Sequence, residues 1–212
     1  MFSPKFILWG GIASAFGGFF WLMTAIAPSS GGPGIELALI LGLGGLVGLY
    51  SRQAGQGGRL GLVGFVLGII GTVLWLATLW WGFTSGRILP STIRSEPVLA
   101  APIVLILLLA GVTLGIGLAL LGVTSLRAKT LSRWQGLPLG LGFLNIIEGV
   151  IFWFIYYVPM SQGRNPFDPW PPQGYIFNVA VLVLLGLGWM GLGTMLATEA
   201  EAQIAQPPSA SA

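Results

Sequence analysis

The sequence predicts an all-α, polytopic membrane protein with six transmembrane helices arranged as three tandem two-helix repeats. Hydrophobic residues make up 55% of the 212 residues and charged residues only 7%, and the mean hydropathy is +0.89. A soluble surface needs about 25 to 35% charged residues, so this chain is expected to lie in lipid. Crossing a bilayer core takes about 20 apolar residues in helical form, and six such runs can be found.

Two glycine patterns alternate along these runs. Three runs carry a pair of glycines seven residues apart with a tryptophan four residues further on, and the runs between them carry Leu-Gly-x-Gly beginning at residues 41, 114 and 185. The first pattern comprises Gly10, Gly17 and Trp21, then Gly64, Gly71 and Trp75, and then Gly142, Gly149 and Trp153. We interpret the alternation as one membrane hairpin used three times, with the repeats related by an axis along the membrane normal.

The first two spans are expected at about residues 6–27 and 35–50. The first could be mistaken for a signal peptide, because Lys5 precedes it and small residues near its end resemble a cleavage site. Its apolar stretch is too long for a signal peptide, so we interpret it as an uncleaved span. The second span is the shortest, and at about 1.5 Å per residue it barely crosses a core of about 30 Å.

The remaining spans are expected at about residues 60–84, 98–123, 137–158 and 175–197. Pro97 and Pro102 suit the opening turn of the fourth span and Pro138 that of the fifth, because the first turn of a helix tolerates proline. Residues 198–212 are polar and low in complexity. We therefore expect a disordered tail after the sixth span.

Positive charges predict the orientation of these spans. The N-terminal segment and the loops after the second and fourth spans hold Lys5, Arg52, Arg59, Arg127, Lys129 and Arg133. The loops after the first, third and fifth spans hold only Arg87, Arg94 and Arg164. Because short cytoplasmic loops carry the excess of Lys and Arg, both termini are expected in the cytoplasm and the protein in the cytoplasmic membrane.

Two residue types are missing from the chain. It has no cysteine and no histidine, which removes disulfides, thiolate nucleophiles and the commonest metal ligands, haem ligands and general bases. No pair of carboxylates lies within the spans. We therefore expect no enzyme activity, no cofactor and no metal site, although a lipid-modifying activity that uses loop residues is not excluded. The net charge of +3 is explained by membrane orientation, so no nucleic-acid partner is expected.

The repeated glycines have two possible roles. Glycines seven apart lie on one face of a helix, and a tryptophan four residues further on stays on that face. Helices in lipid gain no hydrophobic drive from packing together, so close approach at small residues holds them in contact. We expect the glycine pairs to be packing seams for neighbouring glycine-rich helices. The alternative is a ligand or lipid groove capped by Trp21, Trp75 and Trp153.

Glu148 breaks the repeat near the middle of the fifth span. The aligned positions in the other two repeats are Phe16 and Ile70. An ionisable side chain at this depth costs about 2.5 to 3.5 kcal/mol on insertion scales, so such residues usually face a protein interior and mark function. Asn145 lies one turn earlier on the same side of the helix. The pair predicts a site for a proton, a cation or a polar ligand; the alternative is a protonated Glu148 that only hydrogen-bonds a neighbouring helix.

The architecture resembles one known family. Three short hairpins with glycine-rich helices, and a proline just past the first and fifth spans at Pro28 and Pro159, resemble the HdeD-type acid-resistance membrane proteins. The third span departs from that pattern, because no proline follows it until Pro90. The resemblance implies a bacterial inner-membrane protein of six spans without known catalysis, and no functional residue is transferred from it.

Two functional classes remain. The first is a non-catalytic structural or accessory subunit of a membrane assembly, which packs against partners or copies of itself in the lipid bilayer. The second is a small transporter or channel for protons, cations or a polar solute that uses Glu148 and Asn145. The first class needs few buried polar groups, whereas the second needs a polar path that one acid and one amide supply only in part.

Overall fold

The computed structural model describes residues 3–26, 34–54, 56–85, 97–129, 131, 134–162 and 172–205. Its helices are α1 (Pro4–Ile26), α2 (Gly34–Gln53), α3 (Gly58–Thr84), α5 (Pro97–Ala128), α6 (Leu137–Phe152), η2 (Trp153–Tyr157), α7 (Val158–Ser161) and α8 (Pro172–Ala205). Helices α1, α2, α3, α5 and α8 are each long and apolar enough to cross a membrane. The chain is therefore an all-α, multi-pass membrane protein by hydropathy.

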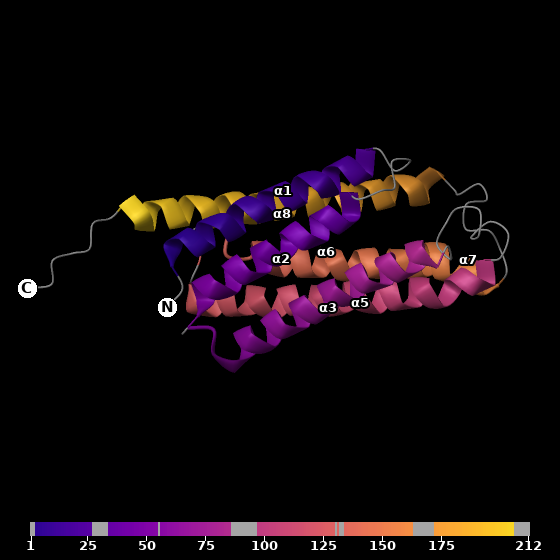
Figure 1. Cartoon of the computed structure of the whole chain (residues 1–212), viewed down its shortest axis with the longest axis horizontal. Coiled ribbons are helices and arrows are strands. Elements are labelled where there is room, and N and C mark those ends of the chain that lie inside the picture. Colours follow the sequence, from indigo (N-terminus) through magenta and orange to yellow (C-terminus); the bar gives the residue numbers. More distant parts are fainter. Residues whose placement is uncertain are drawn as a thin grey trace, which may run out of the picture.

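The long helices run along one axis of the molecule (Figure 1). The first turn of α1 and the last turn of α8 lie at the same end of the bundle (Figure 1). That both ends face the cytoplasm stays a prediction, because the fold alone does not orient a bundle in the bilayer.

The fifth predicted span has an irregular end. Helix α6 passes directly into the π-helix η2 and then into α7, so the chain stays helical a few residues past the predicted end at 158. Pro159 lies in α7; its ring has no N–H and clashes with the carbonyl group four residues earlier. A wider π turn before the proline relieves that clash, which explains why the five residues before Val158 are not α-helical.

The sixth span is longer than predicted. Helix α8 continues to Ala205, so residues 198–205, which we expected in a disordered tail, are helical. This stretch consists mostly of Ala, Glu and Gln, which favour helices; Ala200 is buried, and Glu199 forms an ion pair with Arg52 of α2 at 3.4 Å. The predicted disorder of residues 206–212 lies outside the described residues.

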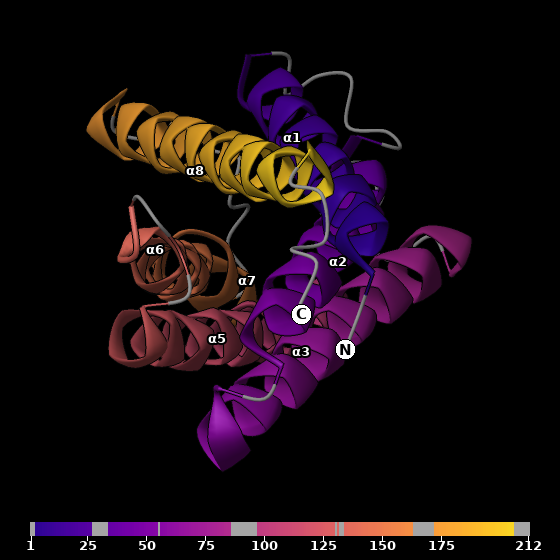
Figure 2. The ribbon, with the colours of Figure 1, turned by 90° about the vertical axis from the view of Figure 1, so that its left-hand side faces the viewer.

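The six long helical segments form two groups of three. Helix α1 packs extensively on α2 and α8, and α5 packs extensively on α3 and α6. We call α8, α1 and α2 the first group and α3, α5 and α6 the second group. Only smaller junctions, chiefly between α2 and α3 and between α6 and α8, join the groups. Viewed along the bundle, α1 and α8 lie above α5 and α6, and α2 lies between α1 and α3 (Figure 2).

The first two hairpins pack through equivalent glycines. A Cβ atom added at Gly10 would lie 2.7 Å from the carbonyl oxygen of Gly44, and one at Gly64 would lie 2.9 Å from that of Gly117. Gly44 and Gly117 occupy the same place in the Leu-Gly-x-Gly pattern. Because real Cβ contacts of this kind are longer, only glycine permits these helix spacings.

The third hairpin does not pack in this way. A Cβ at Gly142 would lie 2.6 Å from the carbonyl oxygen of Gly115, so α6 places its glycines on α5 of the preceding hairpin. Helix α8 instead meets α1, where a Cβ at Gly186 would lie 2.8 Å from the carbonyl oxygen of Gly18. The two helices of the third hairpin are thus divided between the two groups, and the fold leaves a threefold repeat unproven.

Apolar side chains fill the bundle and cover its outside. Buried leucines such as Leu46, Leu118 and Leu192 form one continuous core. Large apolar side chains such as Trp9 and Phe143 are exposed on the outer faces. Exposed apolar area on every long helix is what a surface in contact with lipid tails requires.

Candidate functional site

Asn145 and Glu148 lie inside the bundle on one side of α6. Each is only 1% exposed. The aligned side chains in the first two hairpins point outward, with Phe16 58% and Ile70 45% exposed. Because the glycines of α6 contact α5, the face of α6 that carries Asn145 and Glu148 points into the molecule, away from lipid.

Each of the two side chains has a buried oxygen atom without a hydrogen-bond partner. The Asn145 Nδ2 atom donates to the Leu141 carbonyl oxygen at 2.9 Å, but the Asn145 Oδ1 atom has no partner, and neither has the Glu148 Oε2 atom. Leaving a buried polar atom unpaired costs about 1 to 3 kcal/mol. Such atoms in a native fold call for a functional explanation or a bound water or ion.

Asn145 lines a small cavity at the centre of the bundle. The cavity has a volume of about 10 Å³ and is lined by Trp21, Ala38, Leu39, Gly42, Thr72, Leu114, Asn145 and Trp189. These residues come from all six long helical segments and from both groups. A volume of this size holds at most about one water molecule. The Thr72 hydroxyl donates to its own helix at Gly68, which leaves the Asn145 amide as the main polar group facing the cavity.

Tryptophans surround this cavity. The rings of Trp21 and Trp75 meet edge to face with centroids 5.9 Å apart. Trp189 is buried beside them, and its carbonyl oxygen accepts a hydrogen bond from the Ser14 hydroxyl at 3.0 Å. Trp153 instead stacks on Tyr157 within η2. The three repeated tryptophans therefore do not cap one common groove: two lie in the core between α1 and α3, and the third lies at the end of α6.

All three glycine pairs lie at close helix contacts. Gly17 faces Ala38 of α2, Gly71 faces Ala110 of α5, and Gly149 faces the Leu108 side chain of α5. Together with the contacts of Gly10, Gly64 and Gly142 described above, this placement supports their role as packing seams.

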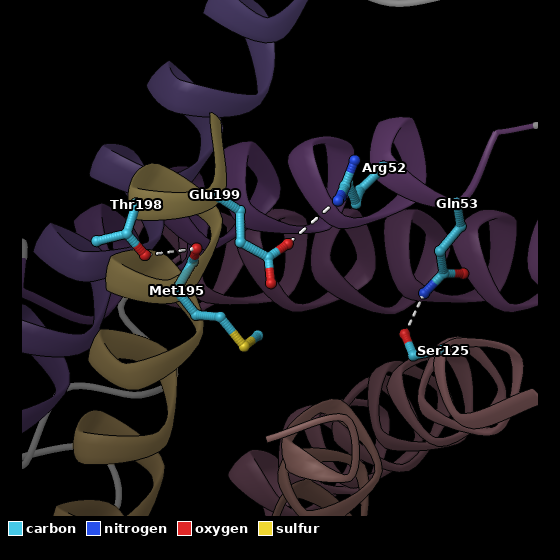
Figure 3. Close-up of polar contacts among 6 residues, drawn as sticks. All are labelled: Arg52, Gln53, Ser125, Met195, Thr198 and Glu199. Carbon is cyan, nitrogen blue, oxygen red and sulfur yellow. Dashed lines mark hydrogen bonds and ion pairs between the residues drawn. The ribbon is translucent and has the colours of Figure 1, made fainter. Parts of the chain in front are cut away.

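A polar cluster, which the sequence did not reveal, joins the two groups at the end of the bundle where the chain begins. Gln53 donates from Nε2 to the Ser125 hydroxyl (Figure 3). It also donates from Nε2 to the Leu121 carbonyl oxygen at 3.0 Å, and its Oε1 accepts from the Thr124 hydroxyl at 2.7 Å. The neighbouring Arg52–Glu199 ion pair lies within the first group (Figure 3). Gln53 follows Arg52, just past the predicted end of the second span, where an exposed loop residue is expected. Nothing in the sequence therefore indicated that its side chain is buried.

A lateral groove opens between α6 and α8 at the same end of the bundle. Its volume is about 690 Å³. It is lined by Trp134, Leu137, Gly140, Leu141, Leu144, Leu184, Leu187, Gly188, Gly191, Thr194, Met195, Thr198 and Glu199. The groove lies where α6 and α8 make only a small junction, because α6 packs mainly on α5 and α8 mainly on α1. It is separate from Asn145 and Glu148, which do not line it.

Within the described residues, no group of three or more Asp and Glu side chains is placed to hold a metal ion. No family model, characterised protein or solved structure matches the chain. The resemblance to HdeD-type proteins therefore stays a prediction. What the sequence and the fold establish together is an integral, multi-pass membrane protein.

Proposed function

We propose that this protein binds and transfers protons within the membrane, with Glu148 as the proton-binding group and Asn145 as its polar neighbour. The observation that carries the proposal is the pair of unpaired, fully buried oxygen atoms, Glu148 Oε2 and Asn145 Oδ1, on the inward side of α6. A carboxyl group in a lipid-embedded core is costly and marks function more often than not. On this basis we favour the transporter or channel hypothesis over the accessory-subunit hypothesis.

The size of the surroundings favours a proton over larger cargo. A cation such as Ca²⁺ or Mg²⁺ takes about six or more oxygen ligands, and a polar solute needs a pocket of some hundreds of Å³. Asn145 faces a cavity of about 10 Å³, in which the other polar side chain, Thr72, bonds its own helix. One buried carboxyl group at Glu148, with a water-sized space one turn earlier at Asn145, suits a proton best.

The division of the bundle into two groups provides a way to expose Glu148 to water. The groups meet through small junctions, whereas the contacts inside each group are extensive. Transporters commonly work by rigid-body rocking of two bundles around a site near the middle of the membrane. In this proposal the Gln53 cluster holds the groups together at one end, and rocking about that end admits water to Glu148.

The test is proton flux in liposomes that enclose a pH-sensitive dye and contain the purified protein. We expect flux above that of empty liposomes, and a loss of at least about tenfold in Glu148→Gln, since the amide cannot take up a proton. Glu201→Gln is the control, because this acid is exposed near the C-terminal end of α8. Equal flux in wild type and Glu148→Gln, or none in either, would reject the proposal.

The accessory-subunit role is the second candidate. It is favoured by the broad apolar outer faces of the bundle and by the small volume, about 10 Å³, of the cavity that Asn145 lines. In this role the protein resides in the cytoplasmic membrane of a bacterium, as a homo-oligomer or within a larger complex, and Glu148 only hydrogen-bonds a neighbour. Mild detergent extraction followed by mass and composition analysis distinguishes the two: a foreign subunit in fixed stoichiometry favours the accessory role.

A further inference from the structure

We propose that the groove between α6 and α8 holds an acyl chain of an anionic phospholipid from the leaflet at the end of the bundle where α1 begins and α8 ends. This binding site is independent of the proton proposal, because neither Glu148 nor Asn145 lines the groove. The dimensions of the groove, the chemistry along its length and the charges at the same end of the bundle carry the proposal.

The dimensions fit a hydrocarbon chain better than a protein helix. On α8 the groove extends from Leu184 to Glu199, which is about 22 Å at about 1.5 Å per residue. The volume of about 690 Å³ lies within the range of about 300 to 1,000 Å³ of pockets that hold small molecules. A helix with side chains is about 10 to 12 Å wide, whereas an acyl chain with carbon contacts of about 4 Å is narrow enough to lie in a groove of this size.

The chemistry changes along the groove as it does across one leaflet. From Leu184 to Thr194 the lining of α8 is mostly Leu and Gly, over a distance of about 15 Å, which is half of a bilayer core of about 30 Å. Beyond it lie Thr198 and Glu199, with Trp134 opposite. Tryptophan is enriched at the level of the headgroups, so the polar end of the groove lies where a phospholipid carries its phosphate.

Positive charges lie at the same end. Arg127 and Lys129 are exposed where α5 ends, at the end of the bundle where α6 begins. The negative charge of Glu199 inside the mouth is offset by Arg52 at 3.4 Å. Basic pockets between transmembrane helices bind anionic headgroups, so we infer a lipid with net negative charge.

The experiment exchanges the purified protein into vesicles of equal parts phosphatidylglycerol and phosphatidylcholine, extracts it in mild detergent and counts retained lipids by native mass spectrometry. Gly140→Phe fills the groove from α6, since a Cβ at Gly140 would meet nothing within 4 Å. Leu187→Trp fills it independently from α8. Ile147→Trp adds the same bulk as Leu187→Trp, but to an exposed face of α6 outside the groove, and is the control.

We expect about one retained phospholipid per chain in wild type and control, and at least about tenfold less in both filled variants. The double variant Arg127→Gln with Lys129→Asn is expected to lower the preference for phosphatidylglycerol by about fivefold or more. Asparagine is chosen because Lys129 has a φ of 48°, which asparagine tolerates. Arg59→Gln, at the exposed start of α3, is its control.

Two results would overturn the proposal. One is equal lipid retention in wild type and both filled variants, with unchanged elution on size exclusion to show that they fold. The other is retention without any preference for phosphatidylglycerol in the wild type. Loss of lipid in these variants together with unchanged proton flux would confirm that the two sites are independent.

Discussion

Replacing Gly10 by alanine tests whether the glycine contacts set the spacing between helices. The new Cβ would lie 2.7 Å from the Gly44 carbonyl oxygen and 2.9 Å from the Gly48 Cα atom. Both are backbone atoms, which cannot rotate away as the end of a side chain can. Because carbon contacts settle at about 3.5 to 4.0 Å, α1 and α2 would have to separate by roughly 0.6 to 1 Å.

The expected cost follows from that displacement. Overpacking of this kind costs about 1 to 3 kcal/mol, because a gap of about 0.5 to 1 Å forfeits a quarter to a half of each contact energy along the interface. Alanine in place of glycine also stabilises the helical conformation by about 1 kcal/mol, which offsets part of this cost. The free energy of unfolding should therefore fall by about 1 kcal/mol in Gly10→Ala.

Gly140→Ala is the matched control, since its Cβ enters open space. It gains the same helix preference without the clash, so its free energy of unfolding should rise by up to about 1 kcal/mol. The assay is unfolding by sodium dodecyl sulfate in mixed micelles, followed by circular dichroism. A shift of the same sign and size in both variants would refute the claim that backbone proximity at Gly10 limits the packing.

Three further variants test the interior. Gln53→Leu should lower the free energy of unfolding by about 2 kcal/mol, at about 0.6 kcal/mol for each of its three hydrogen bonds, whereas Thr113→Val, whose hydroxyl bonds only its own helix, should change little in the same assay. Trp21→Ala should cost about 3 to 5 kcal/mol and quench or shift the tryptophan fluorescence of its partner; an unchanged midpoint would contradict its core placement. Arg52→Gln should cost less than about 1 kcal/mol, since its pair with Glu199 is partly exposed, and a larger loss in low salt would show that the pair is stronger than its exposure allows.

The positions of the helices could be read from the sequence. Hydropathy and glycine spacing located all the long helices to within a few residues, except at the C-terminal end of α8. Glu148 and Asn145 could be singled out because a carboxyl group in an apolar run has a large insertion cost wherever the run packs. The extension of α8 was missed because low complexity was taken as a sign of disorder, although Ala, Glu and Gln favour helices.

The choice of helix neighbours could not be predicted. Glycines occur on more than one face of most of these helices, and a glycine face accepts any helix that offers another small residue. Gly142 could equally have met Gly188 within its own hairpin, but it meets Gly115 of α5. The lateral groove and the burial of Gln53 depend on which helices pack together, so no local sequence pattern could predict them.

The contact between α1 and α8 also constrains how the protein is made. Gly11 and Gly18 on α1 face Gly193 and Gly186 on α8, and the Ser14 hydroxyl between them donates to Trp189. The ribosome delivers α1 first and α8 last, at about 5 to 20 residues per second, so this face of α1 waits in the bilayer for roughly 10 to 40 seconds. During that time its small residues and the Ser14 hydroxyl are available for contact with any other nascent helix nearby. The surface becomes buried only when α8 packs against α1.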